Sequence, residues 1–323
     1  MNNDKNFKAW ITQVFRSIKN FFKQFGTKEF WNKVGKTLST AKFWKTFILY
    51  TITISLFVVF MFPFYMIIIN ALKQKSEIIS DPIAFPTSIR NFFFNIQDIL
   101  TRSNVHYFRS FLYSTIITTV SLIAIGIFSS MAAWVLVRTK TWYSTAIFML
   151  FISGMVIPFQ VVMLPLGTLL QQLKVLTGIP FKDTIHGIVL AYIGFGAPLS
   201  IFMFHGFIKS IPKDIEEAAT IDGCSRPQVF FKIILPVLKP IFVTMLVLNG
   251  MWIWNDYLLP LQILGKGGDI QTLPISVSNL AGLYEKEWGL ILTSVIMAAL
   301  PVIVLFLFAQ KYIIKGMTSG AIK

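Results

Sequence analysis

Charged side chains are scarce in this sequence of 323 residues. Only 13% are Asp, Glu, Lys or Arg, while 55% are hydrophobic. A soluble domain typically carries about 25% charged residues. The composition therefore excludes a disordered protein and argues against an ordinary soluble globule. The single cysteine, Cys224, also excludes an internal disulfide framework and a cysteine-rich metal site.

Patterns that carry enzyme or metal chemistry are lacking as well. His106, His186 and His205 have no paired ligands nearby in the sequence, so we expect no metal site. Ser, His and Asp residues do not assemble into a hydrolase pattern. Gly35-Lys36-Thr37 ends like an ATP-binding P-loop, but Phe30 stands at the position of its first glycine. We therefore expect no enzyme and no cofactor in this chain; if ATP drives the protein, ATP and Mg lie on partner chains.

Long apolar runs take the place of the missing charges. A membrane-spanning helix needs roughly 20 mostly apolar residues, and six runs are of about this length or longer. Apart from Asp256 near the end of the fifth run, they contain no Asp, Glu, Lys or Arg. We therefore predict an all-α membrane protein with six transmembrane helices. The expected spans are 47–70, 111–137, 142–170, 188–207, 240–259 and 290–308.

Two of the expected spans contain helix-breaking residues. The third span is overlong and holds Pro158 and Pro165, and the fourth holds Gly194, Gly196 and Pro198. Membrane helices tolerate such breaks where neighbouring helices or a watery cavity satisfy the freed backbone groups. Kinks for packing and a direct role in substrate contact both remain open.

The basic residues indicate an orientation. If the N-terminus is cytoplasmic, 20 of the 29 lysines and arginines fall in segments on the inner side. Cytoplasmic loops carry an excess of Lys and Arg, so we expect both termini to be cytoplasmic. The net charge of +15 thus indicates a membrane surface and not nucleic acid. The loop 71–110 then lies outside, where its prolines and aromatics suggest an ordered cap.

Residues 1–44 form a separate unit, a basic cytoplasmic extension. Apolar residues recur there at helical spacing, with lysines and arginines mostly off the stripe, which predicts an amphipathic helix. A basic polar face and an aromatic apolar face suit membrane lipid at the inner leaflet, and packing on a partner subunit is the alternative. The stripe consists of Phe7, Trp10, Ile11, Val14, Phe15, Ile18, Phe21, Phe22 and Phe25.

The longest expected cytoplasmic loop, 208–239, contains a short helix with both ends marked in the sequence. Pro212 suits a first turn, and acidic residues at 214, 216 and 217 suit the positive end of the helix dipole. Gly223 can adopt the left-handed conformation that ends a helix. Small side chains at Ala218 and Ala219 leave one surface shallow, so another protein could approach the backbone there.

This loop resembles the EAA loop of binding-protein-dependent ABC importers. The matching residues are Glu217-Ala218-Ala219, Gly223 after three residues, and Ile233-x-Leu235-Pro236 after nine more, within 210–236. The resemblance implies a coupling helix that docks into a cleft of an ATPase subunit. The residues expected to carry the coupling are Glu216, Glu217, Ala218, Ala219, Asp222 and Gly223.

Further stretches resemble the carbohydrate importers of this family. The fifth span reads Trp254-Asn255-Asp256-Tyr257, and the likeness continues to the C-terminus, so that it covers 45–323. The resemblance implies the type I ABC importer permease fold for 45–323, in the cytoplasmic (inner) membrane of a bacterium or archaeon. It also implies a second, different permease subunit, two cytoplasmic ATPase subunits and an extracytoplasmic sugar-binding protein. An ABC importer for a non-sugar solute, or a stand-alone channel or carrier, is the alternative.

The fifth span also offers candidates for the sugar path. Asn249, Trp252 and Asn255 are spaced by three residues, so they share roughly one helix face. Sugars present hydroxyls for hydrogen bonds and C–H faces for aromatic rings, and binding sites place a few polar groups in an apolar wall. We expect some of these side chains to line the path; anchoring at the membrane interface is the alternative for the tryptophan.

Overall fold

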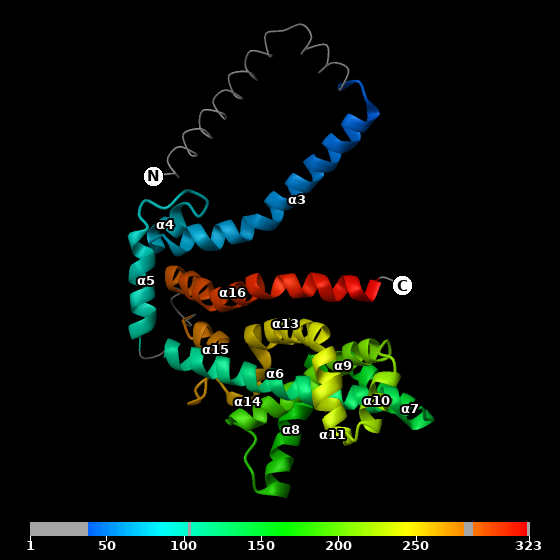
Figure 1. The fold of residues 1–323 in the computed structure, drawn as a ribbon. Helices are drawn as coiled ribbons and strands as arrows, with labels where there is room; N and C mark the ends of the chain where they lie inside the picture. The colour runs from blue at the N-terminus through cyan, green and yellow to red at the C-terminus, as the bar shows by residue number, and fades with distance from the viewer. Residues whose placement is uncertain (1–37, 103–104, 281–286, 322–323) are drawn as a thin grey trace, which may run out of the picture. The chain divides into compact units, whose positions relative to one another are not determined.

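The computed structural model describes residues 38–102, 105–280 and 287–321, and these ranges are helical and without a strand. The expected helix in 1–37 and the P-loop-like residues lie outside the described residues. The chain divides into two compact units, Met1–Met66 and Ile67–Lys323. The helices in chain order are α3 Ala41–Ala71, α4 Lys75–Ser80, α5 Arg90–Thr101, α6 Tyr107–Arg138, α7 Trp142–Val156, α8 Phe159–Thr177, α9 Ile185–Ile208, α10 Asp214–Ile221, α11 Arg226–Gln228, the π-helical η1 Val229–Ile234, α12 Leu235–Val237, α13 Lys239–Asn255, α14 Leu258–Leu264, α15 Leu273–Ser278 and α16 Trp288–Ala321 (Figure 1).

Helix α3 contains the first apolar run, as the sequence predicts. Its large apolar side chains from Phe47 to Phe64 are exposed, and its buried residues are confined to Ile69, Asn70 and Ala71. A helix that is apolar on all sides suits a lipid environment. Its length and composition are sufficient to cross a membrane.

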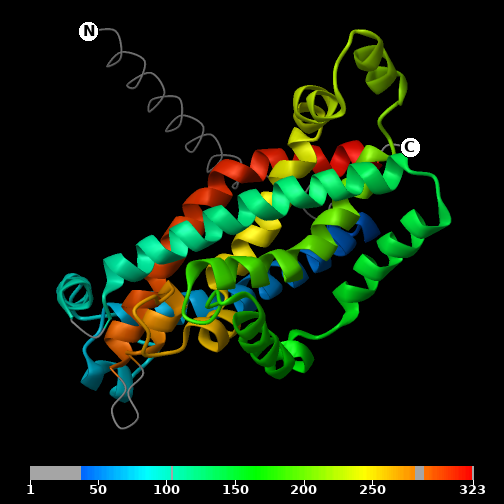
Figure 2. The ribbon, with the colours of Figure 1, turned by 90° about the horizontal axis from the view of Figure 1, so that it is seen from below.

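Three helices of the second unit, α6, α9 and α13, form its core. They lie side by side in Figures 1 and 2, and each contacts the other two. The buried face of α6 is rich in serine, with Ser114, Ser121 and Ser130 among its members. Small residues let membrane helices approach closely. At Gly196 of α9 an added Cβ would lie 2.6 Å from Ile125 Cδ1 and 3.0 Å from Asn249 Oδ1, so only glycine allows this packing.

The third apolar run is not one helix, contrary to the expected span 142–170. It is divided into α7 and α8, which are separated by Ile157 and Pro158 in extended conformation. Proline disfavours helical geometry in the residue before it and lacks the N–H that a continuing helix requires. Helix α8 alone meets the length and composition of a span, whereas α7 has 15 residues. Pro165 remains inside α8.

The fifth run continues a bent path from the loop before it. Helices α11 to α12 meet α13 at an angle of 75°. Counting this bent pair as one span gives six apolar spans in the described residues, and counting only straight helices gives five. Helix α13 ends at Asn255, four residues before the expected end, because Asp256 adopts extended conformation.

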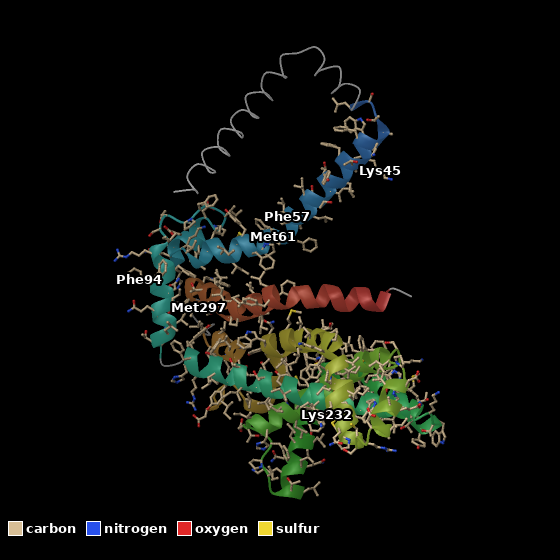
Figure 3. All side chains as sticks on the ribbon, viewed as in Figure 1. Lys45, Phe57, Met61, Phe94, Lys232 and Met297 are labelled. Carbon is tan, nitrogen blue, oxygen red and sulfur yellow. The ribbon has the colours of Figure 1, made fainter. Side chains whose placement is uncertain are left out.

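The segment between α3 and α6, as far as the structure describes it, contains α4 and α5. Helix α5 packs on α16, and Figure 3 marks Phe94 and Met297 on these two helices. Asn95 Nδ2 donates to Thr293 Oγ1 at 3.3 Å, and Arg102 forms ion pairs with Asp98 at 3.0 Å and Glu287 at 2.8 Å. These contacts tie the segment to the start of α16.

Candidate functional site

Helix α10 ends as its sequence indicates. Gly223 has φ +83°, the left-handed conformation that side chains rarely adopt. Its N–H donates to Thr220 O at 3.1 Å, and the N–H of Cys224 donates to Ala219 O at 3.0 Å. This pair of bonds is a Schellman motif, which satisfies the free carbonyls at a helix end. The end of α10 is therefore fixed by backbone geometry.

The start of α10 is two residues later than the proline suggests. The helix begins at Asp214, and Lys213 precedes it in helical conformation. Asp214, Glu216 and Glu217 lie in the first turn, where negative charge interacts favourably with the helix dipole. The figures place this segment, between α9 and α11, at one end of the second unit; in Figure 2 it is the yellow-green projection, and Figure 3 marks Lys232 on the following η1.

Glu216 faces the chain itself. Its Oε1 accepts from Arg138 Nε at 2.7 Å and from the second terminal nitrogen at 2.6 Å, and its Oε2 accepts from Trp134 Nε1 at 3.0 Å. Arg138 also donates to Ile211 O at 3.1 Å. The side chains of Arg138 and Glu216 are 16% and 14% exposed. The carboxylate therefore binds the end of α6 to α10.

The other predicted coupling residues divide between the two sides of α10. Glu217, Ala218, Asp222 and Gly223 are exposed. Ala219 is buried and belongs to the core of the second unit. The exposed residues include two carboxylates, those of Glu217 and Asp222. Ala218 is exposed and carries only a methyl group, so its side chain would not keep another protein from the backbone there.

A cleft of about 370 Å³ opens between the end of α6 and the α10–α11 segment. Charged side chains of both signs line it. Arg138 and Glu216 are paired with each other, and the remaining charged groups at the rim can pair with a partner's charges. The charged lining residues are Arg138, Lys213, Glu216, Glu217 and Arg226.

The three candidates for the sugar path have different surroundings. Asn249 is 2% exposed, and its Nδ2 donates to Ser200 Oγ at 3.1 Å and to Met245 O at 3.2 Å. Trp252 is 38% exposed and lies edge-on to Tyr192, with ring centroids 5.5 Å apart. Asn255 is exposed, with Nδ2 donating to Met251 O at 2.8 Å. Trp252 and Asn255 are thus exposed on the described chain, whereas Asn249 joins α13 to α9.

The neighbouring residues of the same motif hold helices together. Trp254 is buried, and its Nε1 donates to Ala298 O of α16 at 3.0 Å. Asp256 Oδ1 accepts from the N–H of Leu258 at 3.0 Å at the start of α14, and its Oδ2 accepts from Tyr192 O–H at 3.2 Å. These two side chains therefore fix the turn after α13 and its position on α9 and α16.

Sequence reasoning missed Arg138 and Trp134. A basic residue at the end of an apolar run is expected for any cytoplasmic flank, so Arg138 carried no distinctive signal. Its partner lies 78 residues away. The spacing of Trp134 and Arg138 by four residues, which puts them on one helix face, is the signal that could have linked them. In the described part of the chain, no group of His, Cys, Asp and Glu could hold a metal ion.

Residues 122–319 match the family model described as binding-protein-dependent transport system inner membrane component. Over 262 residues the chain is 38% identical to the probable starch degradation products transport system permease protein AmyC of Thermoanaerobacterium thermosulfurigenes, covering 81% of this chain and 91% of the relative. It is 36% identical to the melibiose/raffinose/stachyose import permease protein MelC of Bacillus subtilis, over 81% and 91% of the two chains.

A third relative covers slightly more of the chain. The multiple sugar-binding transport system permease protein MsmG of Streptococcus mutans is 32% identical over 87% of this chain and 97% of the relative. Among solved structures, a bacterial ABC transporter involved in the import of the acidic polysaccharide alginate matches with a TM-score of 0.66. That match has 17% identity and covers 84% of this chain and 98% of the other. At this identity the structural match supports the fold alone.

Proposed function

Since this chain belongs to the binding-protein-dependent transport system inner membrane components, a multi-pass family of transport subunits and not of enzymes, we propose that it is a permease for sugars or oligosaccharides. One observation supports sugars as the substrate class. Three relatives that align over 81% or more of the chain are each named for sugar or starch-product transport. Family membership also implies an ATPase and a substrate-binding protein as partners.

The proposed assembly is that of an importer in the cytoplasmic membrane of a bacterium or archaeon. This chain pairs with a second, different permease subunit, two ATPases bind on the cytoplasmic side, and the binding protein delivers sugar outside. The chain crosses the membrane six times with both termini inside, in accordance with its Lys and Arg distribution. Residues 1–44 lie on the inner leaflet, and 45–323 form the transport domain.

In this proposal α10 is the coupling helix. Exposed Glu217, Ala218 and Asp222 contact the ATPase, Ala219 packs inward, and Gly223 fixes the end of the helix. ATP binding and hydrolysis change the position of the ATPases, and α10 transmits this change to the spans on either side of it. The transport pathway then alternates between outward and inward access, which requires each ligand to favour one of the two states.

The sugar path runs along α13 in the same proposal. Trp252 offers a ring face to sugar C–H groups, and Asn255 offers an amide to hydroxyls. Both are exposed on the described chain. Asn249 is buried and supports the path indirectly, because its bond to Ser200 holds α13 against α9.

The test is transport by the reconstituted complex. The chain is co-expressed with the second permease, the ATPase and the binding protein of its complex, and the complex is placed in proteoliposomes. Uptake of labelled maltotriose, raffinose and arabinotriose is measured with ATP inside the vesicles, together with ATP hydrolysis. Glutamate, glycerol 3-phosphate and a tripeptide serve as non-sugar substrates.

We expect ATP-dependent uptake of at least one sugar and none of the non-sugar solutes. Uptake of a non-sugar solute alone would overturn the substrate class while leaving the importer assignment in place. Uptake by the purified chain without ATPase partners would overturn the importer assignment itself.

A further inference from the structure

The end of α6 contacts three successive parts of the coupling loop. Arg138 binds the carbonyl of Ile211 before α10 and the carboxylate of Glu216 within it. Trp134 donates to the same carboxylate, and its ring lies 5.5 Å from the ring of Phe230 in η1, after α10. Trp134 and Arg138 are four residues apart and share one face of α6. A single helix face therefore contacts the loop before, within and after α10.

These contacts join segments that the chain does not connect directly. Helix α10 is covalently linked to α9 on one side and, through α11, η1 and α12, to α13 on the other. Helix α6 lies earlier in the chain, and α7, α8 and α9 intervene. The interactions of Glu216 thus provide a third connection, a non-covalent one, between α10 and the core helices.

The chemistry of the pair makes this connection a stiff one. Glu216 uses both carboxylate oxygens, and Arg138 approaches with two nitrogens. Both arginine nitrogens meet Oε1, and Trp134 donates to Oε2, so both oxygens of the carboxylate are held, and charge-assisted bonds of this kind are short and strong. Both side chains are largely withdrawn from solvent, where such interactions are screened less by salt. A helix held in this way cannot rotate about its own axis without breaking the pair.

We propose that Arg138 and Trp134 are positioning residues that brace the coupling helix through Glu216, so that motion of α10 reaches α6 directly. The inference deepens the proposed function and rests on it. Adjacent carboxylates then have separate tasks: Glu217 faces the ATPase, while Glu216 faces inward and transmits the motion. Because α6 packs on both α9 and α13, the brace makes the three core helices move as one group.

The test compares transport with ATP hydrolysis in the complete complex, reconstituted in proteoliposomes. The probe is the sugar of the panel above that the unmodified complex imports. The variants are Glu216→Gln, Arg138→Gln and the exchange Arg138→Glu with Glu216→Arg. Lys140→Gln is the matched control, because it removes a positive charge two residues from Arg138 at an exposed position.

We expect each single variant to reduce sugar imported per ATP hydrolysed by about fivefold, at the lower end of typical coupling between sites. Hydrolysis stimulated by the binding protein should remain, because Glu217 and the outer surface of α10 are unchanged. The exchange should restore part of the ratio, because it keeps the ion pair but loses the bonds from Trp134 and to Ile211 O. Lys140→Gln should leave the ratio unchanged. A pair with a merely structural role would change the yield of assembled complex but not the ratio.

A normal ratio in both assembled glutamine variants, or an exchange no better than the single variants, would overturn the brace. If the glutamine variants do not assemble, Arg138→Lys serves as the test, because lysine keeps the charge but offers Glu216 only one nitrogen. It should assemble with a reduced ratio, and assembly with a normal ratio contradicts the proposal. Failure of the unmodified complex to import any sugar would instead count against the proposed function.

Discussion

The end of α10 depends on the backbone conformation of Gly223. Its φ of +83° is disfavoured for residues with a Cβ, and the left-handed region costs roughly 1–2 kcal/mol for most of them. No atom lies within 4 Å of a Cβ added at this position. The requirement for glycine is therefore conformational and does not come from crowding within the chain.

Substitutions at Gly223 should distinguish the effect of backbone conformation from the effect of an added side chain. Gly223→Val strains the backbone, so we expect loss of ATPase from the purified membrane complex, or hydrolysis without sugar uptake. Gly223→Asn should retain more of both, because asparagine adopts left-handed conformations more readily. Gly223→Asp should resemble the valine variant in uptake, because it adds a negative charge at the surface expected to meet the ATPase. Equal activity of the valine and asparagine variants would contradict a conformational role.

Trp252 is the second residue with a clear experimental consequence. Aromatic contacts contribute about 0.5–1.5 kcal/mol beyond burial, which corresponds to a two- to tenfold effect on affinity. We expect Trp252→Ala to weaken sugar uptake in this range while the ATPases remain bound. Trp142→Ala is the control, since Trp142 is an exposed tryptophan at the start of α7, with 81% of its surface accessible against 38% for Trp252. Normal uptake by the Trp252 variant would place the sugar elsewhere, for example on the partner permease.

At the level of elements, two glycines of α9 provide a matched test of helix packing. A Cβ at Gly196 would collide with Ile125 and approach Asn249, whereas a Cβ at Gly194 meets nothing within 4 Å. We expect Gly196→Ala to destabilise the protein by about 1–3 kcal/mol, as overpacking does. Gly194→Ala should be neutral or stabilising by up to about 1 kcal/mol, since alanine favours helix over glycine.

Thermal unfolding of the detergent-solubilised complex measures this difference. A lower Tm for Gly196→Ala than for Gly194→Ala is the expected result. If the two variants unfold at the same temperature, α9 does not pack on α6 and α13 as closely as the distances at Gly196 indicate.

The apolar runs predicted the long helices, because a helix that can span a membrane needs a continuous stretch of apolar residues. The break at Pro158 was visible as a proline, but the sequence did not show whether the helix would bend or stop. Ile157 in extended conformation decides this. The 75° bend between α12 and α13 was not predicted either, since it depends on how the loop packs on the core and not on the composition of the run.

At the scale of the whole molecule, the N-terminal extension is separable from the transport domain in our proposal. Deletion of residues 2–40 removes the predicted amphipathic helix and leaves α3, which begins at Ala41. We expect the shortened chain to keep sugar-stimulated ATP hydrolysis in the assembled complex, though with a lower yield from membranes. Loss of stimulation in an intact complex would show that the extension takes part in the transport cycle.

The short helix α10 and its end at Gly223 could be predicted from the sequence, but the direction of the side chains on it could not. The acidic turn and Gly223 form a local pattern that is complete within 210–236. Glu216 and Glu217 look equivalent in that pattern, and only the fold shows that Glu216 meets Arg138 while Glu217 is exposed. The same holds for Asn249 and Asn255, since burial on α9 separates residues that share a residue type and a helix.

The bond from Cys224 to Ala219 has a practical consequence. It is made by the backbone amide, so the thiol takes no part in closing the helix, and alanine at this position would keep the same bond. Cys224 is also the sole cysteine of the chain. Cys224→Ala therefore yields a subunit without thiols. Single cysteines can then be introduced along α13, and a probe on each one reports on that position of the proposed sugar path.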